Sequence, residues 1–282
     1  KNIYSNPVQA VLREYACNAA DAHSSVGCAD KPIEVHLPTY QNQTLKIRDW
    51  GPGIKEEDVI PIFSTYFVST KTEDNTQTGF LGLGSKSAFA VADQMIVEIW
   101  NSGYHYVWSF YKDEEGYPVV PDGKPTFVSP TVEPTGVLIT IPVNDIQTFE
   151  DTAELVYSYF NPIPIVWKGK EQLKIEPPTI LEQYKSCRLE EGLHGVFAWM
   201  GNILYPINTN ISGLESYKEL GEGRRTVIPF ALGDIEFSAS RESLEDSKRV
   251  LSTLIHNSAE IISDLSLSFH SQIDSDKNAY IP

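Results

Sequence analysis

Two polar residues near the start of the chain, Glu14 and Asn18, have types and spacing that suit metal and water chemistry. Positions four apart on a helix share one face. The amide oxygen of Asn18 can ligate Mg²⁺, and the Glu14 carboxylate one turn away can orient and deprotonate a water molecule. A polar stripe facing solvent has the same spacing, so this pair alone does not decide the function.

A second cluster, Asp49-x-Gly51-x-Gly53, ends a strand-like run. A carboxylate at this position can accept a hydrogen bond from an exocyclic amino group such as adenine N6. Glycines allow a tight turn and a close approach of backbone to a flat ring. An ordinary Asp-Gly turn has the same residues, so this cluster also needs support from others.

A glycine-rich stretch that opens a helix forms the third cluster. It consists of Gly79, Gly82, Leu83, Gly84, Ser85 and Lys86. Backbone N–H groups at a helix start attract anions, and the lysine adds a point charge. No strand precedes the stretch directly and GxxxxGK[ST] is absent, so a Rossmann or P-loop site does not fit. A fourth element is the strand-like run 135–140, whose Thr140 we expect to back an adenine pocket through a water molecule.

The spacing of apolar residues predicts the helices and strands that position these clusters. Apolar residues at helical intervals predict a helix over residues 7–22. Short helices are expected at residues 55–62 and 85–91. Apolar runs between turn residues predict strands at residues 33–37, 44–48, 95–100, 104–111 and 137–143. This order indicates an α/β (α+β) fold, with helices against a mixed or antiparallel sheet.

The second half reads as a separate α/β domain, and we place the boundary so that residues 1–146 and 147–282 form the two domains. Its predicted elements are a helix at 151–160, a strand at 163–167, a hairpin at 195–207 turning at Gly201-Asn202, a strand pair at 227–237 around Gly233-Asp234, and a long helix at 243–271. The chain begins at Lys1, and we expect a further segment upstream of it.

Composition narrows the function classes. The formal net charge is −16, and no basic stripe is present, so nucleic acid is an unfavoured partner. Three cysteines without CxxC spacing argue against a disulfide framework and a zinc site. No apolar run reaches the roughly 20 residues that span a bilayer.

Together and in this order, the four elements resemble the GHKL (Bergerat-fold) ATPases, which include Hsp90, MutL, type II topoisomerase ATPase domains and histidine kinases. The resemblance implies a pocket for ATP and Mg²⁺. It makes Glu14 the general base, Asn18 the Mg²⁺ ligand and Asp49 the adenine anchor. Residues 79–84 would be the ATP lid. It also implies that the second half is a middle or transducer domain.

Arg241 is the candidate catalytic residue of the second half. The stretch Phe237 to Glu245 is similar to the Hsp90 middle-domain segment that carries an arginine to the ATP γ-phosphate. A guanidinium suits a bidentate contact with phosphate and the charge of the transition state. The alternative is a surface ion pair between Arg241 and Glu242 or Glu245.

Over nearly the whole chain, a closer resemblance is to the bacteriophage rapid-lysis IIA-type proteins. The stretches that carry it are Arg13-Glu14, Asp21-Ala22-His23, Arg48-Asp49, Gly51-Pro52-Gly53, Gly82 to Ser87, Lys124 to Val128, Tyr205-Pro206-Ile207 and Ser240-Arg241-Glu242. This resemblance implies a phage protein of the host cytoplasm that counters lysis triggered by host exclusion systems. Peripheral association with the host inner membrane is expected through regions that this sequence lacks.

The leading hypothesis is therefore a slow Mg²⁺-dependent ATPase that acts as a conformational switch, dimerises on binding ATP and works with a host or phage protein partner. The alternative is a non-catalytic interaction module that blocks a host defence partner, with nucleotide bound structurally or lost. A MutL-like DNA-processing ATPase is disfavoured by the net charge of −16. A histidine kinase is disfavoured because a second folded domain follows and no phosphoacceptor helix precedes.

Overall fold

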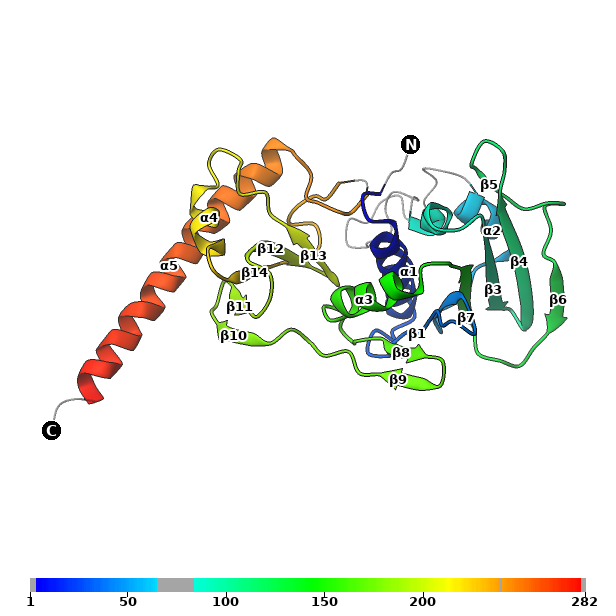
Figure 1. The fold of residues 1–282 in the computed structure, drawn as a ribbon, viewed down its shortest axis with the longest axis horizontal. Helices are drawn as coiled ribbons and strands as arrows, with labels where there is room; N and C mark the ends of the chain where they lie inside the picture. Colours follow the sequence, from blue (N-terminus) through cyan, green and yellow to red (C-terminus); the bar gives the residue numbers. More distant parts are fainter. Residues whose placement is uncertain (1–3, 65–83, 239, 280–282) are drawn as a thin grey trace. The chain divides into compact units, whose positions relative to one another are not determined.

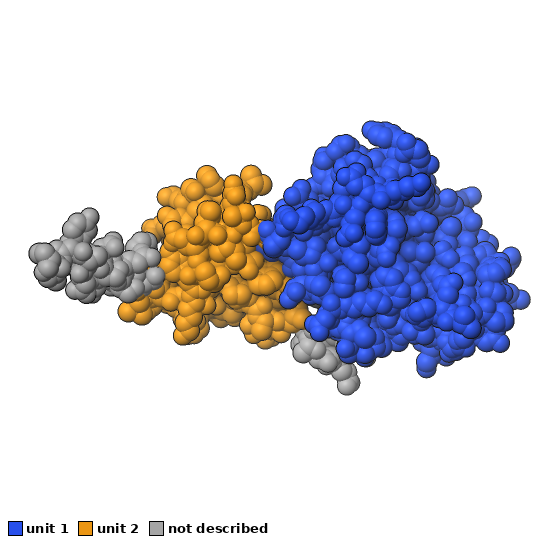
Figure 2. Space-filling view, turned by 90° about the horizontal axis from the view of Figure 1, so that it is seen from below, with its two compact units in different colours: residues 1–177 blue, residues 178–282 orange. Residues whose placement is uncertain are grey.

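The computed structural model describes residues 4–64, 84–238 and 240–279. Its contacts divide the chain into two compact units, residues 1–177 and 178–282, which Figure 2 distinguishes by colour. The boundary expected at residue 146 falls inside the first unit. The reason is that β8 (Ile165–Lys168) pairs in parallel with β1 (Glu34–Leu37), and α3 (Ile146–Tyr157) packs on α1 (Pro7–Ser25).

The first unit is an α/β sandwich built on one large sheet (Figure 1). Along the sheet the strands run β5-β4-β3-β7-β2-β1-β8-β9, and β6 also pairs with β4. Besides β1 and β8, the strands are β2 (Thr44–Arg48), β3 (Gln94–Asn101), β4 (Tyr104–Lys112), β5 (Pro118–Val119), β6 (Phe127–Pro130), β7 (Gly136–Pro142) and β9 (Glu171–Leu173). All pairs except β1 with β8 are antiparallel.

The core of this unit follows the two-residue period of its strands. Leu45 and Ile47 of β2 are buried, while the alternate residues Thr44, Lys46 and Arg48 are half-buried. Val97 of β3 and Ile141 of β7 are fully buried as well. Alternate side chains of a strand point to opposite faces, so these apolar residues line one face of the sheet.

Helix α1 begins at a well-formed cap. The Asn6 side chain accepts a hydrogen bond from the Gln9 N–H at 3.1 Å, and Pro7 occupies the first turn. Its apolar residues Val11 and Leu12 are fully buried. In the core, the Tyr157 hydroxyl of α3 donates to the Leu12 carbonyl at 3.5 Å. The helix is thus fixed along its length by cap and core.

The predicted helix at 85–91 is a 3₁₀ helix, η1 (Gly84–Ala90), which follows α2 (Glu56–Ser64) in the described chain. Its last turn closes with an i to i−3 hydrogen bond from the Val91 N–H to the Ala88 carbonyl at 3.0 Å. The segment is short, and the Ser85 hydroxyl is held by the Ile62 carbonyl at 2.7 Å. Short, tethered segments favour the tighter helix.

The second unit has a five-stranded sheet in the order β10-β11-β14-β12-β13. Its elements are β10 (Ile180–Gln183), β11 (Arg188–Glu190), β12 (Gly195–Met200), β13 (Ile203–Pro206), α4 (Glu215–Gly221), β14 (Arg225–Phe230) and α5 (Lys248–Ala279). The hairpin β12–β13 turns at Gly201-Asn202, as predicted. Helix α5 starts where the Ser247 hydroxyl accepts from the Val250 N–H, five residues after the predicted start at residue 243.

The predicted strand pair around Gly233-Asp234 is wrong. Strand β14 lies in the middle of its sheet, between β11 and β12, so both of its edges are already paired. The residues after it form a turn with one isolated bridge between Leu232 and Ile235. The Asp234 carboxylate closes this turn by accepting from the Ala231 N–H at 2.8 Å.

Tyr15 is expected to hold η1 on α1. Its buried hydroxyl donates to the Ser85 carbonyl at 2.7 Å. Tyr15→Phe should lower the free energy of unfolding by about 1–2 kcal/mol, because a buried carbonyl loses its partner. Urea unfolding measures this, and Tyr111→Phe, at a hydroxyl-bearing ring that is 41% exposed, is the control. Equal effects of both substitutions would contradict the assignment.

Candidate functional site

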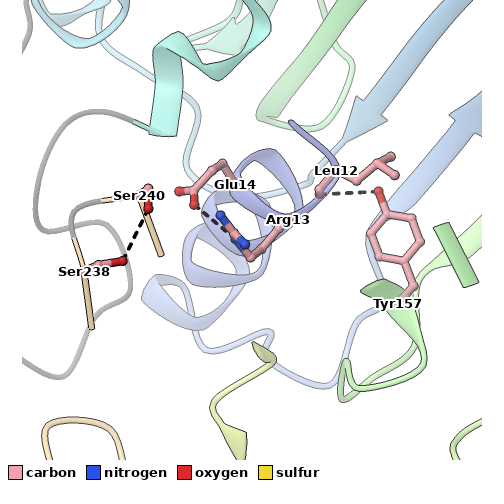
Figure 3. A network of polar contacts seen from close by, with 6 residues as sticks. All are labelled: Leu12, Arg13, Glu14, Tyr157, Ser238 and Ser240. Atoms are coloured by element: carbon pink, nitrogen blue, oxygen red, sulfur yellow. Dashed lines mark hydrogen bonds and ion pairs between the residues drawn. The ribbon is translucent and has the colours of Figure 1, made fainter. Parts of the chain in front are cut away.

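Glu14 lies on the buried side of α1, with only 2% of its surface exposed. The neighbouring Arg13 guanidinium contacts it, with Nε at 3.3 Å from Oε1, and Figure 3 shows the two side chains together. A Cβ added to Gly84 would overlap the Glu14 carboxylate. A larger residue at the start of η1 would therefore displace this carboxylate, because the backbone there runs directly against it.

Asn18 lies one turn beyond Glu14 on α1 and is half-buried. Within residues 4–64, 84–238 and 240–279, no group of three or more His, Cys, Asp and Glu side chains could hold a metal ion. A cation near Asn18 would therefore take the amide oxygen together with oxygens of a ligand and of water. Mg²⁺ is commonly bound in this way beside phosphates.

Asp49 follows the end of β2, and its carboxylate is buried. Oδ1 accepts from the Gly51 N–H at 2.8 Å and from the Val137 N–H at 3.3 Å. The Asp49 N–H in turn donates to the Val137 carbonyl at 2.9 Å. Among the described residues, both hydrogen bonds to the carboxylate end on Oδ1, which leaves Oδ2 as the acceptor for an exocyclic amino group.

Burial raises the pKa of Asp49 to about 6, although the Gly51 N–H, the charge of Arg48 and the Val137 N–H all act to lower it. The carboxylate is thus ionised at neutral pH, but with a smaller margin than an exposed aspartate has.

The turn after Asp49 depends on its two glycines. Gly51 packs on the end of α1, where an added Cβ would lie 2.6 Å from the Ala22 Cβ. Gly53 has φ +73°, in the left-handed region that favours glycine. These constraints bring the turn that carries Asp49 against the helix that carries Glu14 and Asn18.

Ser85 and Lys86 lie in η1, directly after Gly84. The Ser85 carbonyl accepts from Tyr15, and its hydroxyl donates to the Ile62 carbonyl. Lys86 is 4% exposed, and burial lowers its pKa to about 8. The remaining residues of the predicted glycine-rich stretch, Gly79, Gly82 and Leu83, lie outside the described residues.

Thr140 does not lie beside Asp49. Its register partner on β2 is Lys46, and its partner on β3 is Ile96. Directly paired residues of an antiparallel sheet share a face, so Thr140 projects opposite to the buried Ile47 and Asp49. The residue beside Asp49 is Val137, three residues earlier. The expectation that Thr140 backs an adenine pocket at Asp49 is therefore wrong, because Thr140 projects from the other face of the sheet.

Arg241 belongs to the second unit. It is 5% exposed, its φ is +53°, and its Cζ lies 5.4 Å from the centroid of the Phe237 ring. Its N–H donates to the Ser238 carbonyl at 2.8 Å. An arginine in the left-handed region costs about 1–3 kcal/mol, and such strain is concentrated at functional sites. The alternative of a pair at the surface does not fit, because Arg241 is buried.

His23 is a site residue that the sequence reasoning did not single out. It lies in the last turn of α1 and is 1% exposed. Its Nε2 is 2.8 Å from the Trp50 nitrogen, and its Nδ1 is 2.8 Å from the Lys31 carbonyl oxygen. Both partners are distant in the sequence, so no local spacing reveals this role.

Residues 4–117 match the family described as histidine kinase-, DNA gyrase B-, and HSP90-like ATPase. The matched range includes Glu14, Asn18, Asp49 and the glycine-rich stretch. Residues 4–117 are thus similar to a GHKL-type ATPase domain, and we refer to them as the GHKL domain.

Two solved structures of the ATPase region of Saccharomyces cerevisiae topoisomerase II are similar to the chain. The one bound to ICRF-187 (dexrazoxane) has a TM-score of 0.60 at 15% identity, covering 91% of this chain and 85% of that chain. The other has a TM-score of 0.59 at 16% identity, covering 90% and 85%. No curated protein matched. The predicted GHKL α/β fold is thereby confirmed, while the transducer assignment of the second half and the roles of single residues stay predictions.

The buried Asp49 carboxylate should make the stability of the GHKL domain depend on pH. The pKa of Asp49 in the folded protein is about 6, above the ordinary value of 3.8. The contribution of the neutral carboxyl group to the free energy of unfolding is therefore fully present below pH 3.8 and is lost as the pH rises through about 6. Asp49→Asn keeps the Oδ1 acceptor without the charge. It should raise the free energy of unfolding by about 1–3 kcal/mol at pH 8 and hardly at pH 4.

Urea unfolding at both pH values measures this difference, and Asp30→Asn, at an exposed carboxylate, is the control. A gain in stability that is the same at pH 4 and pH 8 would show that the Asp49 charge is not the cause.

Proposed function

We propose that the GHKL domain binds ATP with Mg²⁺ and hydrolyses it slowly. The observation that carries this proposal is the buried Asp49 carboxylate, held by Oδ1 in a glycine turn that packs on the helix of Glu14 and Asn18. A buried carboxylate with one oxygen held by backbone is costly unless a donor completes its shell. Adenine supplies such a donor at N6, so the residues fit the nucleotide.

Asn18 and the phosphate oxygens would hold Mg²⁺, which neutralises phosphate charge when it is bound. Lys86 adds positive charge near the start of η1, and backbone N–H groups of the glycine-rich stretch suit the phosphates. Glu14 accepts the proton of the attacking water as the bond from the water oxygen to the γ-phosphorus forms and the bond from that phosphorus to the β,γ-bridging oxygen breaks, which releases ADP and phosphate. Arg13 contacts Oε1 of Glu14 and keeps the carboxylate oriented.

We also propose that the second unit senses the nucleotide through Arg241. Arg241 contacts the γ-phosphate, so ATP and ADP favour different arrangements of the two units. The cycle acts as a conformational switch with ATP-dependent homodimerisation. From the resemblance to rapid-lysis IIA-type proteins alone, we place this switch in lysis inhibition in the host cytoplasm or at its inner membrane, together with a host or phage protein. No helix in the described part of the chain is long and apolar enough to cross a membrane.

Glu14→Gln should bind ATP with nearly unchanged affinity and lower the turnover number by about 10²–10⁴-fold, because the general base is lost while the side-chain volume next to Gly84 is kept. Phosphate release measures turnover, and calorimetry measures the Kd for ATP. Glu57→Gln, at an exposed residue of α2, is the control.

In the same assays, Asp49→Asn should lose at least about tenfold in ATP affinity, since an amide N–H₂ faces the adenine amino group. Unchanged binding by this variant would overturn the pocket. If wild type binds ATP without turnover and Glu14→Gln changes nothing, the interaction module is the correct function.

For Arg241 we expect nearly normal ATP binding and reduced turnover. Arg241→Asn is the sharpest substitution, because asparagine tolerates the left-handed backbone at φ +53° that alanine does not. Arg249→Asn, at an exposed arginine that pairs with Glu236, is the control. Turnover equal to that of wild type would remove Arg241 from the mechanism.

A further inference from the structure

His23 joins two loops to the end of α1 through the two nitrogens of one buried ring. Nδ1 is 2.8 Å from the Lys31 carbonyl oxygen, which can only accept a hydrogen bond. Nε2 is 2.8 Å from the backbone nitrogen of Trp50, whose N–H can only donate. Nδ1 must therefore carry the proton and Nε2 the lone pair. Only this neutral tautomer satisfies both partners.

The surroundings of His23 favour the neutral ring. Burial is the largest cause that lowers the pKa of His23, and the charges of Lys31 and Arg48 lower it further. The Lys31 ammonium lies 4.1 Å from the centroid of the Trp50 ring, and the Arg48 guanidinium lies 5.6 Å from it. The carboxylate of the same turn, Asp49, bonds instead to the backbone of Gly51 and Val137.

We propose that His23 is a positioning residue that sets the affinity for ATP by holding the Trp50 N–H, and with it the Asp49 carboxylate, in register with α1. Trp50 stands between Asp49 and Gly51, so its backbone cannot shift without moving the adenine anchor. The helix that holds Trp50 also carries Glu14 and Asn18. His23 thereby fixes the spacing between the adenine end and the phosphate end of the pocket. This inference rests on the proposed function.

Two substitutions separate the two hydrogen bonds of His23. Glutamine places its amide oxygen near the position of Nε2, so His23→Gln keeps the acceptor for Trp50 and loses the donor to Lys31. Asparagine is shorter and reaches only the position of Nδ1, so His23→Asn keeps the donor to Lys31 and loses the acceptor for Trp50. Each variant replaces a neutral ring by a neutral amide and keeps one of the two hydrogen bonds.

The experiment measures Kd for Mg²⁺-ATP, turnover at saturating ATP and thermal stability for wild type, both His23 variants and Asp49→Asn. His23→Gln should bind within about threefold of wild type, and His23→Asn should bind about tenfold more weakly, because a buried N–H loses its acceptor. Turnover at saturation should stay near wild type in both. Equal losses of affinity, or losses that follow thermal stability in both variants, would overturn the proposal.

ATP binding by the wild type distinguishes a failure of the proposed function from a failure of the His23 proposal. If wild type does not bind ATP, the ATP pocket fails, and the role of His23 in affinity fails with it. The geometric part is then decided by ¹⁵N NMR of the free protein, which should show the Nδ1-protonated tautomer at pH 7. Hydrogen exchange at the Trp50 amide should be slow in wild type and His23→Gln and faster in His23→Asn. Unchanged exchange in His23→Asn would refute the hydrogen bond.

Discussion

Burial of the Asp49 carboxylate is the constraint on which the first unit depends. An ionised carboxylate away from water is costly unless hydrogen bonds compensate it. The fold supplies two backbone N–H donors, from Gly51 within the turn and from Val137 on the neighbouring strand. Those bonds are possible only because β2 ends against β7 at this register and because Gly51 permits contact with α1. The raised pKa of Asp49 shows that compensation is incomplete in the free protein.

Helix α1 also buries polar and charged side chains, which costs free energy in the same way. Arg13, Glu14 and His23 are all nearly buried on a helix whose other buried residues are apolar. Each polar group has an identified contact: Arg13 and Glu14 meet each other, and His23 meets Lys31 and Trp50. A purely apolar face would stabilise the helix more simply. The buried polar residues are therefore the positions on α1 where a functional site is expected.

Sequence reasoning recovered the parts of the fold that depend on local periodicity. The α1 face and the alternation in β2 and β3 repeat over several residues, so one substitution cannot hide them. Asp49 and Glu14 could be singled out because their neighbouring glycines and spacing carry information, and their roles stay predictions. Thr140 was misplaced because one residue of register reverses the face of a strand. His23 was missed because its partners lie 8 and 27 residues away, where only tertiary structure brings them together.

Two charged groups in the described part of the GHKL domain, Asp49 and Lys86, have pKa values that burial shifts in opposite directions. Burial raises the pKa of Asp49 to about 6 and lowers that of Lys86 to about 8, so both groups are charged at pH 7 with a smaller margin than exposed groups have. An amino donor at Asp49 and an anion at Lys86 would each favour the charged form and move the two pKa values apart. In the proposed complex, one nucleotide would place its amino group at Asp49 and its phosphates near Lys86, so it would favour the charged form of both side chains. The free domain thus holds a buried Asp49 carboxylate whose Oδ2 the amino group of a nucleotide would complete, and His23 keeps this anchor in register with the helix that carries Glu14 and Asn18.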